Sequence, residues 1–120
     1  AVDDFGCTSD ESVDYPDYAL PVAQAVAAGT ADYGVLVCGT GLGMMLSANK
    51  VSGIRAVNIT STQLAALSRE HNNANVITLS GRFVSLEENE AILDTFFTTE
   101  FAGGRHNRRV EKIMAIEQEA

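Results

Sequence analysis

The chain has 120 residues, 46% of them hydrophobic and 20% charged, which is an ordinary length and balance for a single soluble globular domain over residues 1–120. Its net charge of −8 disfavours non-specific binding to nucleic acid or to an anionic membrane, since both need a basic surface. No apolar run approaches the roughly 18 residues that cross a bilayer, and two cysteines are too few for a disulfide framework. We therefore expect a cytoplasmic protein with reduced thiols and no membrane or nucleic-acid partner.

The predicted elements alternate between apolar runs and helical patterns. Val2–Phe5 is a weak strand candidate, and the polar residues 6–14 follow it as a surface loop. A helix is predicted over Tyr15–Ala28, because a proline stands near its start and a glycine directly after its end. Gly34–Cys38 is short and almost wholly apolar, as is typical of a strand buried on both faces of a parallel sheet.

The same alternation continues to the end of the chain. It predicts a helix over 44–50, a strand over 54–59, a helix over 61–72, a strand over 76–79, a helix after Ser85 and a last helix over 107–118. Thr60 with Gln63, and Ser85 with Glu88, have the spacing of a capping box at a helix start.

Two of these helices carry an apolar stripe, which predicts packing against the sheet for the helix after Ser85 and an inward face for the last helix. The stripes comprise Leu86, Ile92, Leu93, Phe96 and Phe97 in the helix after Ser85, and Val110, Ile113 and Met114 in the last helix. Strands separated by helices imply right-handed crossovers and an open parallel sheet. The predicted fold is therefore a doubly wound α/β domain with helices on both faces of the sheet.

A glycine-rich turn, CGTGLG, follows the strand that ends at Cys38. Ligands of open parallel sheets bind beyond the carboxyl ends of the strands, which makes this turn a candidate site. Gly39, Gly41 and Gly43 let the backbone approach a ligand, and the next helix directs unpaired amide groups toward it. The alternative is a turn that only joins a strand to a helix.

The turn does not match a dinucleotide fingerprint well. That motif would need its third glycine where this chain has Met44, and the next predicted strand carries no acidic residue for a ribose. Nucleotide binding is therefore the least favoured reading. A thiol at Cys38 has a physical reason to be reactive, because a helix N-terminus stabilises the thiolate. Alternatively Cys38 is a small buried hydrophobe; no role is assigned to Cys7.

The stretch GGRHNRR over Gly103–Arg109 concentrates positive charge at the start of the last helix, where the helix dipole disfavours cations. A bound phosphate would offset this cost, because Arg105 and Arg109 are four residues apart on one helical face and guanidinium groups bind phosphate oxygens in pairs. His106 lies beside them. The alternative is a solvated cluster that pairs with acidic residues.

Three further residues, His71, Asn72 and Arg82, indicate a site only when taken together with the glycine turn and the arginine cluster. His71 and Asn72 end a predicted helix, where the helix dipole favours a histidine and the cap geometry favours asparagine. Arg82 follows the next strand and is unremarkable alone. The sequence shows no metal-ligand spacing and no Ser-His-Asp arrangement.

Five stretches together resemble the RpiB/LacAB family of sugar-phosphate isomerases, nearest to its ribose-5-phosphate isomerase B branch. They are DYPDYA at Asp14–Ala19, VCGTGLG at Val37–Gly43, SANKVSGIRA at Ser47–Ala56, REHNNANV at Arg69–Val76 and GGRHNRRVEKI at Gly103–Ile113. Each stretch alone would be weak, but they occur in one order along the whole chain.

The resemblance implies the interconversion of ribose 5-phosphate and ribulose 5-phosphate without a metal or organic cofactor. By the same resemblance, Cys38 carries a proton between C1 and C2 of the sugar, and Thr40 and the glycine turn hold the enediolate. His71 would open the sugar ring and Asn72 would bind hydroxyl groups. The remaining site residues would be Arg82, Arg105 and Arg109 at the phosphate, with His106 beside them and Tyr15 lining the cleft. A homodimer or tetramer is expected, with the site between two subunits.

One departure from the family pattern leaves alternatives open. Family members begin with a further strand, an Asp-His turn and a helix before the region of Val2, and this sequence has none of them. The strand would lie inside the sheet, so we expect a truncated chain. Since the turn supplies a ring-opening aspartate, a non-catalytic sugar-phosphate-binding subunit remains an alternative. An isomerase for allose 6-phosphate or galactose 6-phosphate is another.

Overall fold

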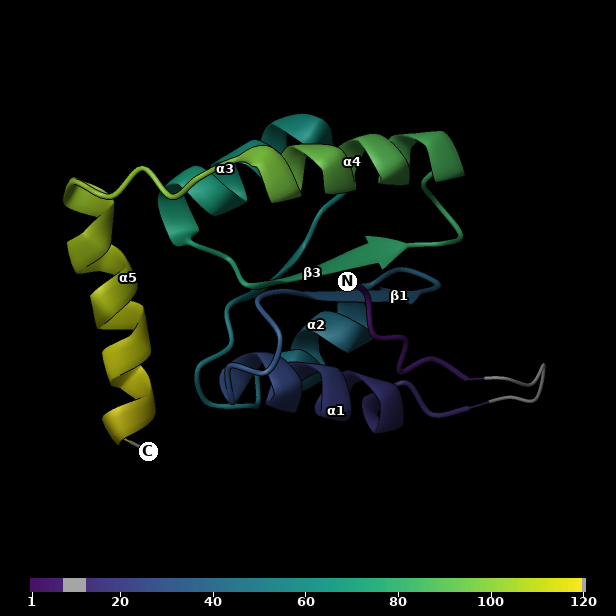
Figure 1. The fold of residues 1–120 in the computed structure, drawn as a ribbon, viewed down its shortest axis with the longest axis horizontal. Helices are drawn as coiled ribbons and strands as arrows, with labels where there is room; N and C mark the ends of the chain where they lie inside the picture. Colours follow the sequence, from purple (N-terminus) through teal and green to yellow (C-terminus); the bar gives the residue numbers. More distant parts are fainter. Residues whose placement is uncertain (8–12, 120) are drawn as a thin grey trace.

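The computed structural model describes residues 1–7 and 13–119. In chain order its elements are α1 (Pro16–Ala27), β1 (Gly34–Cys38), α2 (Leu42–Ala48), β2 (Ala56–Asn58), α3 (Thr62–Asn72), β3 (Val76–Ser80), α4 (Leu86–Thr98), α5 (Arg105–Ala115) and a 3-10 turn, η1 (Ile116–Glu119). The three strands are parallel and lie in the order β1-β3-β2. Helices α1 and α2 cover one face of the sheet and α3 and α4 the other, which confirms the predicted doubly wound α/β fold (Figure 1).

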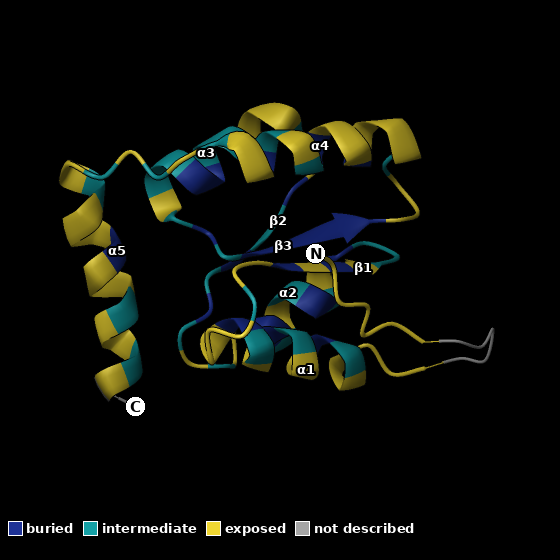
Figure 2. Cartoon of the chain, in the orientation of Figure 1, coloured by how far each residue is buried: buried dark blue, intermediate teal, exposed yellow. Residues whose placement is uncertain are grey.

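The central strand β3 divides the core into two clusters. Val76 faces α1 and α2, whereas Ile77 and Leu79 face α3 and α4, because alternate residues of a strand point to opposite faces. The first cluster also holds Ala19, Ala23, Val26, Leu36, Met44, Ala48, Ile54 and Ala56, and the second holds Ile59, Ala65, Ala74, Ile92 and Phe96. All five residues of β3 are buried, so the strand is covered along its whole length (Figure 2).

The outer strand β1 is open on one side, since among the described residues it pairs with β3 alone. Leu36 packs under the helices of the first cluster, so Val35 and Val37 point to the opposite face. Their side chains remain 37% and 52% exposed. The neighbouring segment Val2–Phe5 was predicted as a strand and is not one. Its residues are exposed and belong to no strand in the described structure. A strand forms only where its backbone groups have a partner strand to bond with.

Several predicted boundaries and caps also need correction. Helix α2 begins at Leu42 rather than at Met44, because Gly41 caps it in a left-handed conformation. Ser61, not Thr60, caps α3, since its extended backbone places Oγ to accept a hydrogen bond from the amide of Leu64. The predicted cap of α4 is confirmed, with the Ser85 hydroxyl accepting from the next turn.

Two further boundaries differ from the prediction. β2 covers only three residues of the predicted 54–59. Helix α5 begins at Arg105, two residues early, because the chain turns at Gly103 and Gly104.

The outer helices are less buried than their patterns predict. In α4, Ile92 and Phe96 enter the core, but Leu86 and Phe97 are exposed, so the apolar stripe is narrower than predicted. In α5, Val110 is buried and Ile113 is largely exposed, because this helix packs on the end of α3 and not on the sheet. No helix among residues 1–7 and 13–119 is long and apolar enough to cross a membrane.

Candidate active site

The glycine turn brings the Cys38 thiol to the N-terminus of α2. The Cys38 Sγ accepts a hydrogen bond from the amide of Gly41 at 3.1 Å, and the Thr40 Oγ1 accepts one from the amide of Leu42 at 3.1 Å. Backbone N–H donors and the positive end of a helix stabilise a thiolate relative to a thiol. The hydrogen of the Thr40 hydroxyl is left free to donate to a bound oxygen.

Three hydrogen bonds fasten this turn to the end of β3. The Ser80 Oγ donates to the carbonyl of Gly39 at 2.7 Å, and the Gly81 amide donates to the carbonyl of Cys38 at 2.9 Å. The Arg82 amide donates to the carbonyl of Gly39 at 3.1 Å. The Arg82 guanidinium consequently lies beside the turn, with Cζ 3.5 Å from the position of a Cβ on Gly39. Within one chain Arg82 therefore lies beside the turn that carries Cys38, and not with Arg105 and Arg109, with which it was grouped at the phosphate.

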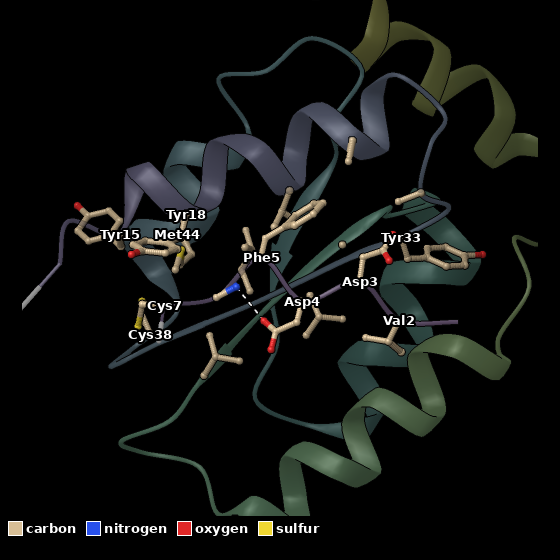
Figure 3. Close-up of a pocket in the computed structure, with 18 of the residues that line it drawn as sticks. Val2, Asp3, Asp4, Phe5, Cys7, Tyr15, Tyr18, Tyr33, Cys38 and Met44 are labelled. Carbon is tan, nitrogen blue, oxygen red and sulfur yellow. Dashed lines mark hydrogen bonds between the residues drawn. The ribbon is translucent and has the colours of Figure 1, made fainter. Parts of the chain in front are cut away.

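Tyr15 belongs to the same group of residues. Its ring lies so close to Gly43 that a Cβ at this glycine would overlap it. Tyr15, Cys38 and Met44 line a cleft of about 1030 Å³ that opens beside β1. They gather at one end of that cleft, with Tyr18 (Figure 3).

Gly41 is the glycine that the turn needs most. Its φ of +86° is in the left-handed region, and a Cβ there would overlap the side-chain oxygen of Asn58 and lie 3.0 Å from the carbonyl of Leu79. We expect Gly41→Ala to lower the free energy of unfolding by about 1–3 kcal/mol, measured by urea denaturation. Gly39→Ala is the matched control, because a Cβ there makes only ordinary contacts, and should change stability by less than about 1 kcal/mol. Equal losses would contradict this account of the turn.

A second group of predicted residues forms where α3 ends and α5 begins. The rings of His71 and His106 are stacked, with centroids 4.2 Å apart and planes 13° apart. The pKa of His106 is lowered chiefly because the half-buried ring is partly removed from water. Electrostatic interactions with His71, Arg105 and Arg109 lower that pKa further.

A buried arginine, Arg69, joins segments that lie next to this second group. Arg69 donates to the carbonyl of Ala74 at 2.6 Å and, through Nε, to the carbonyl of Thr99 at 3.2 Å. It also donates to the Asn73 side chain at 2.9 Å and to the Tyr33 hydroxyl at 3.2 Å. Arg69 therefore joins the end of α3, the connection between α4 and α5, and the residue before β1.

The two groups lie at opposite ends of the sheet. Cys38 is in register with Ser80, the last residue of β3, whereas His71 and Asn72 precede Val76, its first residue, by only a few positions. Four residue steps of about 3.3 Å separate the ends of β3 by roughly 13 Å. In Figure 1 the arrow of β3 points to the right, whereas α5 lies at the left end of the molecule. Within one chain, the predicted residues therefore form two separate groups.

Asn72 belongs to the second group and faces a different cavity. It lines a cleft of about 740 Å³ between α5 and the body of the domain, together with Arg55 and Glu117. The cleft beside Cys38 does not include it. Among residues 1–7 and 13–119, no cluster of three His, Cys, Asp or Glu side chains could hold a metal ion.

Sequence reasoning missed two polar residues that shape the first group. The Asn58 Oδ1 accepts from the Thr78 hydroxyl at 2.9 Å and occupies the space that a side chain at Gly41 would need. Ser80 is buried and holds Gly39. Both are polar residues at the carboxyl ends of apolar strands, and that position was the signal that could have identified them.

Comparisons with known proteins show which family the chain resembles. The family model described as Ribose/Galactose Isomerase matches residues 1–113. Ribose-5-phosphate isomerase B of Escherichia coli is 50% identical over 115 residues, which cover 96% of this chain and 77% of that protein.

Solved structures give the same result. A structure of Clostridium thermocellum ribose-5-phosphate isomerase B superposes with a TM-score of 0.94 and 51% identity, over 96% of this chain and 78% of that one. The Mycoplasma genitalium ribose-5-phosphate isomerase B, solved with bound ribulose 5-phosphate, gives a TM-score of 0.89 and 48% identity, over 92% of this chain and 74% of that one.

Proposed function

The chain belongs to the ribose/galactose isomerase family, and on that basis we propose that it interconverts ribose 5-phosphate and ribulose 5-phosphate. The observation that carries the chemistry is the Cys38 thiol, which accepts the Gly41 amide hydrogen at the start of α2. A thiol so placed can lose its proton and act as a base at a carbon next to a carbonyl group.

The reaction moves two protons within one sugar. The Cys38 thiolate takes the proton from C2 of the open-chain aldose, and the electron pair of that C–H bond forms the C1–C2 double bond of an enediolate. The thiol then returns the proton to C1, while the hydroxyl proton moves from O2 to O1. The two carbons exchange oxidation state internally, so no step requires an external oxidant or reductant.

The glycine turn stabilises the charge that develops in this step. The Thr40 hydroxyl, whose oxygen accepts from the Leu42 amide, can donate its hydrogen to an enediolate oxygen. Preorganised donors of this kind commonly make the largest single contribution to such a reaction. Tyr15 closes one side of the cleft and Arg82 places a positive charge beside the turn.

The second group would serve the rest of the substrate. His71 opens the furanose ring by proton transfer, and Asn72 binds sugar hydroxyls. Arg105 and Arg109 hold the phosphate, since guanidinium groups pair with phosphate oxygens. In this proposal the local excess of cations that the helix dipole disfavours is offset when the dianion binds.

A complete site requires two copies of the chain. One copy cannot bring His71 to Cys38, because the two residues lie at opposite ends of β3. A symmetric pair can place the second group of each copy against the first group of the other. We propose a homodimer, or a tetramer built from it, with two such shared sites.

The test is an isomerase assay of the purified protein with ribose 5-phosphate, allose 6-phosphate and galactose 6-phosphate. We expect the highest kcat/KM with ribose 5-phosphate, because the relatives at about half identity are ribose-5-phosphate isomerases. A higher value with either hexose phosphate would change the assigned substrate. Saturable binding of all three sugars without turnover would instead indicate a binding subunit.

A further inference from the structure

The stacked histidines connect two helices that carry different parts of the proposed site. His71 lies in the last turn of α3 and His106 in the first turn of α5. Their ring centroids are 4.2 Å apart and their planes differ by 13°, so the rings lie nearly face to face. Face-to-face contact covers one face of the His71 imidazole and leaves both ring nitrogens, which lie in the ring plane, free to hydrogen-bond.

The backbone around the stack fixes where His106 lies. Consecutive positive φ angles at Gly103 (+68°) and Gly104 (+57°) turn the chain back onto α3. The Ala102 amide donates to the carbonyl of Glu70 at 3.1 Å, one residue before His71, and the His106 amide donates to the carbonyl of Gly103 at 3.0 Å. The start of α5 is thus tied to the end of α3, so the two rings meet through a constrained connection.

The surroundings of His106 favour its neutral form. The pKa of His106 is lowered by partial removal from water and then by electrostatic interactions with His71, Arg105 and Arg109. A protonated imidazole would be one more cation in this group, whereas a neutral ring can stack without that repulsion. A neutral histidine also binds a phosphate dianion more weakly than an arginine does, because it lacks the charge and the paired donors of a guanidinium group.

We propose that His106 is a positioning residue: its stacked ring holds the His71 imidazole in the orientation that opens the sugar ring. This inference rests on the proposed function, in which His71 transfers the ring-opening proton. Such a group must lie within about 2.6–3.2 Å of the atom it protonates, and a half-exposed histidine at a helix end would otherwise sample several rotamers. Stacking removes these rotamers without occupying the nitrogens.

The test compares His106→Ala, which removes the stack, with His106→Phe, which keeps a flat ring but no nitrogen. The substrates are ribose 5-phosphate and 4-deoxyribose 5-phosphate, which lacks the C4 oxygen and cannot form a furanose. With ribose 5-phosphate, His106→Ala should lower kcat about 10- to 100-fold with KM nearly unchanged, and His106→Phe should stay within about threefold of the unsubstituted protein. With the deoxy sugar, neither variant should lower kcat.

The outcomes separate this inference from its alternatives. If both variants raise KM equally for both sugars, His106 is a phosphate ligand and the inference is wrong. If His106→Ala lowers kcat equally for both sugars, its effect is not on ring opening and the inference is again wrong. Turnover of neither sugar by the unsubstituted protein would instead refute the proposed function itself.

A second readout does not depend on activity. Stacking shields the ring protons of His71, so their NMR resonances should lie upfield in the unsubstituted protein and in His106→Phe, and should return to ordinary positions in His106→Ala. Well-dispersed spectra would confirm that each variant is folded. Unchanged His71 resonances in His106→Ala would show that the rings do not stack in solution, which would overturn the inference.

Discussion

Replacing Cys38 with alanine is expected to lower kcat for ribose 5-phosphate by about 10²- to 10⁴-fold, which is what a positioned proton carrier contributes. The thiol accepts a hydrogen bond from the Gly41 amide at the start of α2, and alanine leaves the turn without a base. KM should change little, because Tyr15, Arg82 and the arginines of α5 remain. Steady-state kinetics in both reaction directions would measure this.

Two companion variants make the result specific. Cys7→Ala removes the other thiol of the chain, which is exposed, and should leave kcat within about twofold. Cys38→Ser keeps the size of the side chain and its acceptor atom but ionises far less readily than a thiol, so it should be nearly as inactive as Cys38→Ala. Retention of more than a tenth of kcat in Cys38→Ala would remove Cys38 from the proton-transfer step.

Mixing two inactive variants is expected to restore activity. A Cys38→Ala chain retains His71 and a His71→Ala chain retains Cys38, so a mixed dimer contains one complete shared site and one doubly impaired site. Random pairing makes half of the dimers mixed, so an equimolar mixture should recover about one quarter of the unsubstituted activity after subunit exchange. Activity would be followed as the two purified variants exchange.

A mixture of Cys38→Ala with Thr40→Ala is the matched control. Both residues belong to the same turn, so a mixed dimer has no site with both intact and should recover nothing. If the first mixture also recovers nothing while the dimer forms and exchanges, the two groups do not meet across a subunit interface. Recovery in the control mixture would show that Cys38 and Thr40 act from different copies.

The sequence predicted the fold class and the glycine-rich turn after β1 for local reasons. The apolar run before Cys38, the alternate glycines and the following helix are all encoded within a dozen neighbouring positions. The anchoring of that turn to Ser80 and the contact of Tyr15 with Gly43 could not be predicted, because they join residues far apart in the chain. Their polar or aromatic character alone is compatible with many surface positions.

Strand order and edges were also beyond local reasoning. The run Val2–Phe5 has a strand-like pattern but no partner in the described part of the sheet, and pairing decides whether such a run becomes a strand. The separation of the two groups follows from the direction of α3, which runs back to the start of β3. Placing His71 relative to Cys38 therefore required the three-dimensional fold.

The open side of β1 bears on how the molecule behaves in concentrated solution. Its five residues, GVLVC, contain no charge and no proline, and among residues 1–7 and 13–119 the strand pairs on one side only, which leaves the side chains of Val35 and Val37 partly exposed. Natural edge strands usually carry lysine, proline or a bulge, which hinder strand-to-strand aggregation. A net charge of −8 opposes such contacts between copies of this 120-residue sequence, because like-charged molecules repel one another. Colloidal stability should therefore fall with added salt, and with acidification toward the isoelectric point near 4.5.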